Sequence, residues 1–187
     1  MKKIILKEQT ERVDSQHEQF EMILDGCRLN EGAAQRQLYN RYYRYAMSIA
    51  FRYTSDYDNA VEMVNDGFFK IFRELKKFAP RNENTAASFM AWFKQVIIFA
   101  CIDHLRKYNK KEGRVIVEPA KVAIEDTCKN AVGILQHKDI IHCIQQLSPV
   151  YKMVFDLYAI EGYSHAEIAN KLNISEGTSK VIFIKQG

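Results

Sequence analysis

Residues 147–180, LSPVYKMVFDLYAIEGYSHAEIANKLNISEGTSK, contain the most informative pattern in this chain. Ser148 and Pro149 favour a helix start, because serine accepts a hydrogen bond from an unpaired amide and proline has no amide to leave unpaired. Gly162 can adopt the left-handed conformation that ends such a helix. Residues 164–167, SHAE, match a capping box, which begins the next helix at a defined residue.

The second of these helices would pack through Ile168, Ala169 and Leu172, where the small alanine permits a close helix crossing. Asn173 suits a tight turn with positive φ, and Ser175 can cap the helix that follows. Two helices joined in this way are the arrangement that places a helix in the major groove of DNA. The alternative is an ordinary helical hairpin at the end of an α-helical domain, and spacing alone does not separate the two.

Length and composition indicate a soluble globular protein. The chain has 187 residues, enough for one or two small domains, with 47% hydrophobic and 27% charged residues. A net charge of +4 permits polyanion binding without requiring it. The first thirteen residues lack a signal-peptide core, and the longest uncharged apolar run, 96–102, is far shorter than the ~20 residues that span a bilayer. We therefore expect a cytoplasmic protein without direct membrane insertion.

The sequence offers little for catalysis or metal binding. The four cysteines show no C-x-x-C pairing, which is typical of reduced thiols (Cys27, Cys101, Cys128 and Cys143). His137, His142 and Cys143 are the nearest approach to a ligand set, but positions 137 and 142 do not share a helix face. Glycine-rich phosphate loops and nucleophile motifs are absent from the sequence. We expect no enzymatic activity, no metal and no cofactor.

Helical periodicity organises most of the chain. Apolar residues recur at helical spacing in three long stripes, with members such as Leu38, Tyr42 and Tyr45, then Val64 and Phe68, then Phe89 and Phe93. The expected fold class is all-α, with two small helical domains. The first would cover 16–111, a linker 112–132, and the second, containing the helix-turn-helix, 133–187.

Acidic residues share one face of the second stripe. Asp58, Glu62 and Asp66 are spaced by four, opposite the apolar residues. Acids early in a helix suit its dipole, and a solvated face is the common outcome for such a strip. A surface for a basic partner helix is the alternative, and it accounts better for Asp66.

Basic residues gather at the end of the third stripe (His104, Arg106, Lys107, Lys110, Lys111 and Arg114). The helix dipole favours cations there, although so dense a cluster also fits a phosphate-contacting patch. Trp92 lies one residue off the stripe that contains Phe93. It can belong to the core, or it can stack on an unpaired base.

These blocks resemble the extracytoplasmic-function sigma factors, the small two-domain branch of the bacterial sigma family. The similar blocks are AVEMVNDGFFKIF (60–72) for the polymerase-binding helix, FMAWF (89–93) with IDHLRK (102–107) for the promoter-melting and minus-ten helix, and EGYS (161–164) with ISEGTSK (174–180) for the minus-thirty-five domain. They occur in the family's order and cover nearly the whole chain beyond residue 16.

The resemblance implies a sigma factor that binds RNA polymerase core and directs initiation at promoter DNA, with an anti-sigma factor as a further partner. The implied polymerase-binding residues are Glu62, Val64, Asp66 and Phe69. The implied minus-ten residues are Asn82, Asn84, Trp92, His104, Arg106, Lys107 and Lys110. The implied minus-thirty-five residues are Ser175, Thr178, Ser179, Lys180 and Lys185.

Two features depart from the family pattern. Phe99 stands where the family usually has a polar residue. After Lys180 the chain reads VIFIKQG (181–187), where the family continues with polar and basic residues. This favours a shortened or frameshifted C-terminus with impaired minus-thirty-five affinity, and a modified specificity is the alternative.

Two other functions fit parts of the pattern. A C-terminally defective sigma-like protein would act only as a competitor for polymerase or for an anti-sigma factor. A stand-alone helix-turn-helix repressor would need a symmetric dimer, and the sequence shows no dimerisation heptads.

Overall fold

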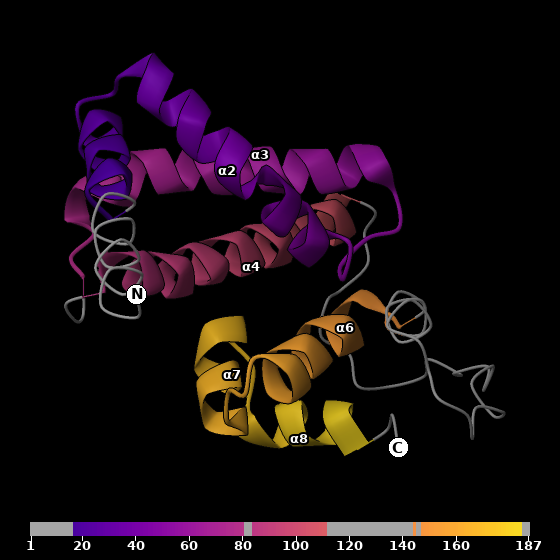
Figure 1. Cartoon of the computed structure of the whole chain (residues 1–187). Helices are drawn as coiled ribbons and strands as arrows, with labels where there is room; N and C mark the ends of the chain where they lie inside the picture. The colour runs from indigo at the N-terminus through magenta and orange to yellow at the C-terminus, as the bar shows by residue number, and fades with distance from the viewer. Residues whose placement is uncertain (1–16, 81–83, 112–143, 145–146, 185–187) are drawn as a thin grey trace, which may run out of the picture. The chain divides into compact units, whose positions relative to one another are not determined.

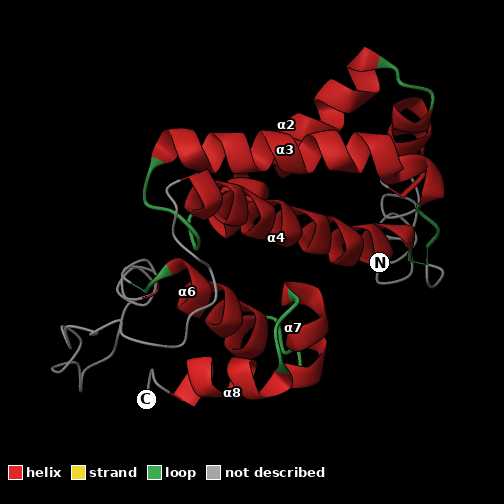
Figure 2. Cartoon of the chain, turned by 180° about the vertical axis from the view of Figure 1, so that it is seen from behind, coloured by secondary structure: helices red, strands yellow, loops and turns green. Residues whose placement is uncertain are grey.

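The computed structural model describes residues 17–80, 84–111, 144 and 147–184, and these fall into two compact units. One unit comprises Met1–Ser48 and Val61–Ala100, and the other Ile49–Ala60 and Cys101–Gly187. Throughout the described ranges the regular structure is helical, without a strand, so the all-α fold class is confirmed (Figures 1 and 2). The expected linker, 112–132, lies outside the described residues, and the boundaries at 16–111 and 133–187 stay predictions.

The first unit is a bundle of long helices (Figure 1). A helical segment at 17–28 precedes α2 (Gly32–Ala50), α3 (Tyr57–Glu74) with the short 3-10 helix η1 (Leu75–Lys77), and α4 (Thr85–Lys111). Figures 1 and 2 show α3 and α4 lying side by side. Gly67 on α3 permits this approach, because a Cβ atom there would come within 2.5 Å of Cδ1 of Ile97 on α4.

Aromatic rings form the core of the first unit, as the stripes predict. Phe93 is fully buried, with its ring centroid 5.1 Å from that of Tyr42 and 5.5 Å from that of Phe68. Phe89 is also buried and packs 5.4 Å from Phe20. Aromatic pairs at these separations add to the free energy of burying their surface.

One described helix, Thr85–Lys107 within α4, is long and apolar enough to cross a membrane by length and composition. Half of that stretch is buried inside the protein. Phe89, Phe93 and Ile97 are among the residues through which α4 packs, and each is fully buried. The apolar character of α4 is therefore that of a core helix.

In the second unit, α6 (Pro149–Phe155) continues as the π-helix η2 (Asp156–Ile160), and α7 (His165–Leu172) and α8 (Glu176–Ile184) follow. Gly162 and Asn173 adopt positive φ of 75° and 55°, as the turn analysis predicts. The capping box of α7 is confirmed: the Ser164 amide donates to Glu167 at 2.8 Å, and the Glu167 amide donates to the Ser164 hydroxyl at 3.3 Å. Ser148 is the N-cap of α6, but its side chain makes no capping hydrogen bond, so the chain relies on Pro149 there.

A buried polar cluster joins residues 49–60 to α6 and η2 within the second unit. Asp156 is fully buried, accepts a hydrogen bond from the Tyr53 hydroxyl, and lies 3.2 Å from Nε of Arg52. Arg52 also pairs with Glu161, with 3.1 Å between Nη1 and Oε1.

Burial also shifts the pKa values of two groups in this cluster. Lys152 donates a hydrogen bond to the Tyr53 carbonyl at 3.1 Å, and burial lowers the pKa of this lysine to about 8. Burial raises the pKa of Tyr53, and the neighbouring Asp156 carboxylate adds to the shift.

Candidate nucleic-acid interface

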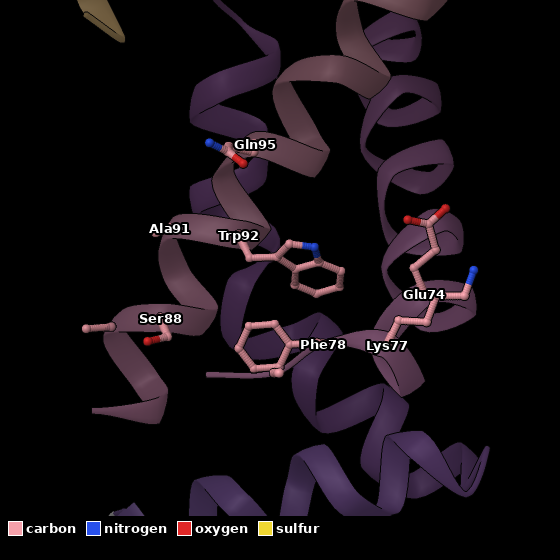
Figure 3. Close-up of a pocket in the computed structure, with 9 residues that line it drawn as sticks. Glu74, Lys77, Phe78, Ser88, Ala91, Trp92 and Gln95 are labelled. Atoms are coloured by element: carbon pink, nitrogen blue, oxygen red, sulfur yellow. The ribbon is translucent and has the colours of Figure 1, made fainter. Parts of the chain in front are cut away.

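A cavity lies beside Trp92 in the first unit (Figure 3). It has a volume of about 430 Å³ and lies between the end of α3 with η1 and the first turns of α4. Its lining residues are Glu74, Lys77, Phe78, Ala79, Ala87, Ser88, Ala91, Trp92 and Gln95. An aromatic wall therefore faces a few polar and charged groups.

Packing holds the Trp92 indole at the edge of the cavity. Its ring centroid lies 5.2 Å from that of Phe78 and 5.8 Å from that of Phe89, and the side chain remains partly exposed. Figure 3 shows the Trp92 and Phe78 rings together, with Glu74 and Lys77 coming from the neighbouring segment. The tryptophan thus contributes to the core and still presents ring surface to the cavity.

The sequence identified Trp92 but not the other polar groups around it. Glu74 and Lys77 reach the cavity from the end of α3 and from η1, and Gln95 reaches it from α4, so the packing of these two segments brings the three side chains together. Phe78 follows η1 and continues the periodicity of the apolar stripe of α3. That periodicity is the sequence feature that could have predicted its buried side.

Of the two asparagines that the resemblance implies as minus-ten residues, one is described. Asn84 is exposed, and its side-chain oxygen accepts a hydrogen bond from the Ala87 amide at 2.9 Å, so it caps the start of α4. Asn82 lies outside the described residues.

The basic end of α4 belongs to the second unit. Lys107 is exposed, whereas His104 and Arg106 are partly buried. Arg106 lies 3.6 Å from Asp103 and donates to the Lys171 carbonyl at 3.4 Å, so its guanidinium is already engaged. The backbone of Lys110 is helical, while its side chain lies outside the described part of the protein.

The expected polymerase-binding residues divide between surface and core. Glu62 is exposed, Asp66 is partly buried, and the Phe69 ring is 67% exposed, with the Arg73 guanidinium 5.9 Å from its centroid. Val64 is fully buried and presents no surface to a partner. Its place in the apolar stripe of α3 is the physical reason.

The start of α8 is tied together by its own polar side chains. Ser175 caps the helix through the Thr178 amide at 2.9 Å, and the two hydroxyls lie 2.8 Å apart. Lys180 pairs with Glu176 at 2.7 Å, and this hydrogen bond lowers the pKa of the glutamate. Ser179 is fully buried with its hydroxyl 2.9 Å from Nδ1 of His165, so it faces the interior and not a ligand. Lys185 lies outside the described residues.

The apolar run after Lys180 divides between the core and the surface, and the sequence alone did not show which residues belong to each. Ile182 is buried, and Phe183 packs 4.5 Å from Tyr158, so both belong to the core of the helix-turn-helix. Val181 and Ile184 are exposed by 43% and 73%. The outer face of α8 is therefore apolar, as the sequence indicates, but only Val181 and Ile184 of the four apolar residues lie on it.

Nothing within the described residues groups three or more potential metal ligands. His137, His142 and Cys143, the nearest approach to a ligand set in the sequence, lie outside them.

Comparison with protein families assigns both parts of the chain. A family model described as Sigma-70 region 2 matches residues 38–111, and one described as Sigma-70, region 4 matches residues 137–181. The chain belongs to the sigma-70 family of sigma factors. Region 2 followed by region 4 is the arrangement that the resemblance to the extracytoplasmic-function branch predicts.

Solved structures with related chains are distant. One is the sigma factor RpoE in complex with the anti-sigma factor NepR from Bartonella quintana, at 18% identity and a TM-score of 0.46, covering 80% of this chain and 89% of that one. Another is CnrH in complex with the cytosolic domain of CnrY, at 16% identity and a TM-score of 0.43, covering 88% and 89%. No protein of curated function matches significantly. The assignment therefore rests on the two family matches.

Proposed function

We propose that this sigma-family protein binds RNA polymerase core and directs transcription initiation by separating the minus-ten element and binding the minus-thirty-five element. The observation that carries the proposal is the aromatic cavity beside Trp92, which lies inside the region 2 match. A partly exposed indole over a cavity with polar walls is the type of site that holds an unpaired base.

The cavity supplies the groups that base capture requires. Extruding a base costs a few kcal/mol, and stacking on an aromatic ring returns about 1–3 kcal/mol per base. Ser88, Gln95 and Glu74 offer hydrogen-bonding groups to the edge of a base, and Lys77 offers a charge to its phosphate. Lys107, exposed near the end of α4, is a further cation for the separated strand, and His104 adds a side chain that can form hydrogen bonds.

The outer face of α3 is the proposed polymerase surface. Glu62, Asp66 and Phe69 combine carboxylates with an exposed aromatic ring, which suits a basic helix of the polymerase. Val64 contributes indirectly, because its burial fixes the rotation of α3 about its axis.

The start of α8 is the proposed duplex-binding element. Ser175, Thr178 and Lys180 lie at or near a helix N-terminus, where amides and the dipole favour phosphate. Phosphate contacts of this kind set position and orientation on DNA without reading sequence.

The proposal includes an anti-sigma factor as a partner and a cytoplasmic location without membrane insertion. The anti-sigma partner is the one that the resemblance to the extracytoplasmic-function branch implies. Sigma-family proteins are regulatory, and we propose no catalytic residue, metal or cofactor for this chain.

Co-purification with sigma-free polymerase core tests the first step. We expect a stable complex that Glu62→Arg weakens, because it reverses charge on the proposed surface. Glu18→Arg, at an exposed position on the segment 17–28, is the matched control and should leave the complex intact. Absence of a complex with the unaltered chain rejects the proposal.

The alternative function is that of a competitor for polymerase or for an anti-sigma factor. The exposed apolar side chains of Val181 and Ile184 on the outer face of α8 support it. Such a protein would bind core polymerase without opening promoter DNA. Permanganate footprinting of the complex on promoter fragments separates the two functions, because only an initiating sigma factor makes minus-ten thymines reactive.

A further inference from the structure

The outer face of α8 carries an aliphatic stripe that runs from its second residue to its last. Gly177, Val181 and Ile184 are separated by four and three residues and therefore lie on one side of the helix. Val181 is 43% exposed and Ile184 is 73% exposed. In the helix-turn-helix, α8 is the second helix, the one that enters the major groove in proteins with this motif.

Packing on the opposite side fixes which residues face outward. Ile182 is buried, and Phe183 contacts the Tyr158 ring at 4.5 Å. The buried Ser179 hydroxyl is held by His165 at 2.9 Å, and that imidazole stacks on Tyr158 at 4.4 Å. These contacts prevent α8 from rotating to hide its aliphatic stripe.

Gly177 leaves the backbone bare at the start of the stripe. A Cβ atom there would meet only the Ser175 hydroxyl, at 3.7 Å, which is an ordinary contact. The fold therefore does not require glycine at this position, and glycine within a helix is less stable than alanine. The missing side chain leaves the helix backbone open to close approach by a ligand.

Among the described residues of α8, charge does not dominate this face. Lys180 and Glu176 pair at 2.7 Å and largely neutralise each other beside the stripe. The ligand must therefore present apolar groups as well as phosphates. In the major groove the apolar group is the C5-methyl of thymine, and aliphatic side chains read it by contact.

We propose that Val181 and Ile184 determine base specificity by contacting thymine methyl groups in the minus-thirty-five duplex. This rests on the proposed function of α8 as a duplex-binding helix. The departure of residues 181–184 from the polar pattern of the family then gives a changed sequence preference.

Thymine-to-uracil replacement tests the proposal, because uracil pairs in the same way but lacks the methyl group. The full chain, bound to polymerase core, would first select its preferred duplexes from a randomised pool. Uracil would then replace each thymine of the selected site in turn. Burying one methyl group predicts a roughly fourfold loss of affinity for each contacted thymine.

The variants Val181→Ser and Ile184→Ser should bind the thymine and uracil duplexes equally. Ala166→Ser, at an exposed position on α7, is the matched control and should keep the discrimination. All three positions are exposed, so we expect each variant to fold, and thermal unfolding checks this.

Three results overturn the proposal. Selected duplexes that contain no thymine at the site, or that bind equally well with uracil, show that the stripe does not read methyl groups while the proposed function stands. Variants that keep the discrimination but bind polymerase core more weakly show that the stripe is a protein-docking face. Failure of the complex to bind any duplex rejects the proposed function itself.

Discussion

Replacing Trp92 removes the indole ring from the cavity and leaves Phe78 in place, and the size of the effect follows from the stacking energy of a base. A base stacked on an aromatic ring gains about 1–3 kcal/mol, which corresponds to a roughly 5- to 150-fold change in an equilibrium constant. Trp92→Leu keeps an apolar side chain but loses the ring face. Trp92→Phe keeps a ring, so it should retain most of the activity.

The fold should survive both changes. Trp92 pairs with Phe78 at 5.2 Å and with Phe89 at 5.8 Å, and each aromatic pair contributes about 1 kcal/mol. This is small against the ~5–15 kcal/mol by which proteins of this size are stable. Thermal unfolding of each variant checks the point independently of function.

Promoter opening is the assay, followed by the fluorescence of 2-aminopurine placed in the minus-ten element with saturating polymerase core. We expect opening by Trp92→Leu to fall by at least fivefold, and opening by Trp92→Phe to fall less. If a folded Trp92→Leu variant opens the promoter as well as the unaltered chain, the indole is only a core residue and the proposed base capture is refuted.

Three further outcomes are expected. Because burial lowers the pKa of Lys152 to about 8, below its ordinary value of 10.5, the unfolded state binds more protons between these values. The contribution of Lys152 to the free energy of unfolding should therefore rise by about 2 kcal/mol from pH 8 to pH 10, measured in urea as the difference between the unaltered chain and Lys152→Met, and a difference that does not change with pH would contradict the burial. Ser164→Ala should destabilise the second unit by about 1 kcal/mol in the same assay by removing the capping box, whereas no change would show that α7 does not depend on it. Lys107→Glu should weaken opening more strongly at low salt than at high salt, and a loss independent of salt would argue against a phosphate contact.

Local sequence signals predicted the helices and their ends well. The capping box at Ser164 and the left-handed turn residues Gly162 and Asn173 act within a few residues of themselves, so the sequence is enough to locate them. The aromatic stripes likewise predicted the core of the first unit, because their periodicity does not depend on which helix they meet.

The parts that were missed depend on contacts between distant residues. Val64 and Ser179 were expected at interfaces, but helix rotation in the packed state turns both inward. The cluster around Asp156 joins residues about a hundred positions apart, as its pairing with Tyr53 shows, and no local pattern marks it. The polar lining of the cavity beside Trp92 was missed for the same reason.

Run-off transcription by sigma-free polymerase core, with and without this chain, tests the central claim most directly. The template library should come from genomic DNA fragments, so that promoter choice is not assumed. The proposed function predicts defined transcripts that require the chain and that diminish with Trp92→Leu. Core polymerase that binds the chain but produces no additional transcript from any fragment would contradict it.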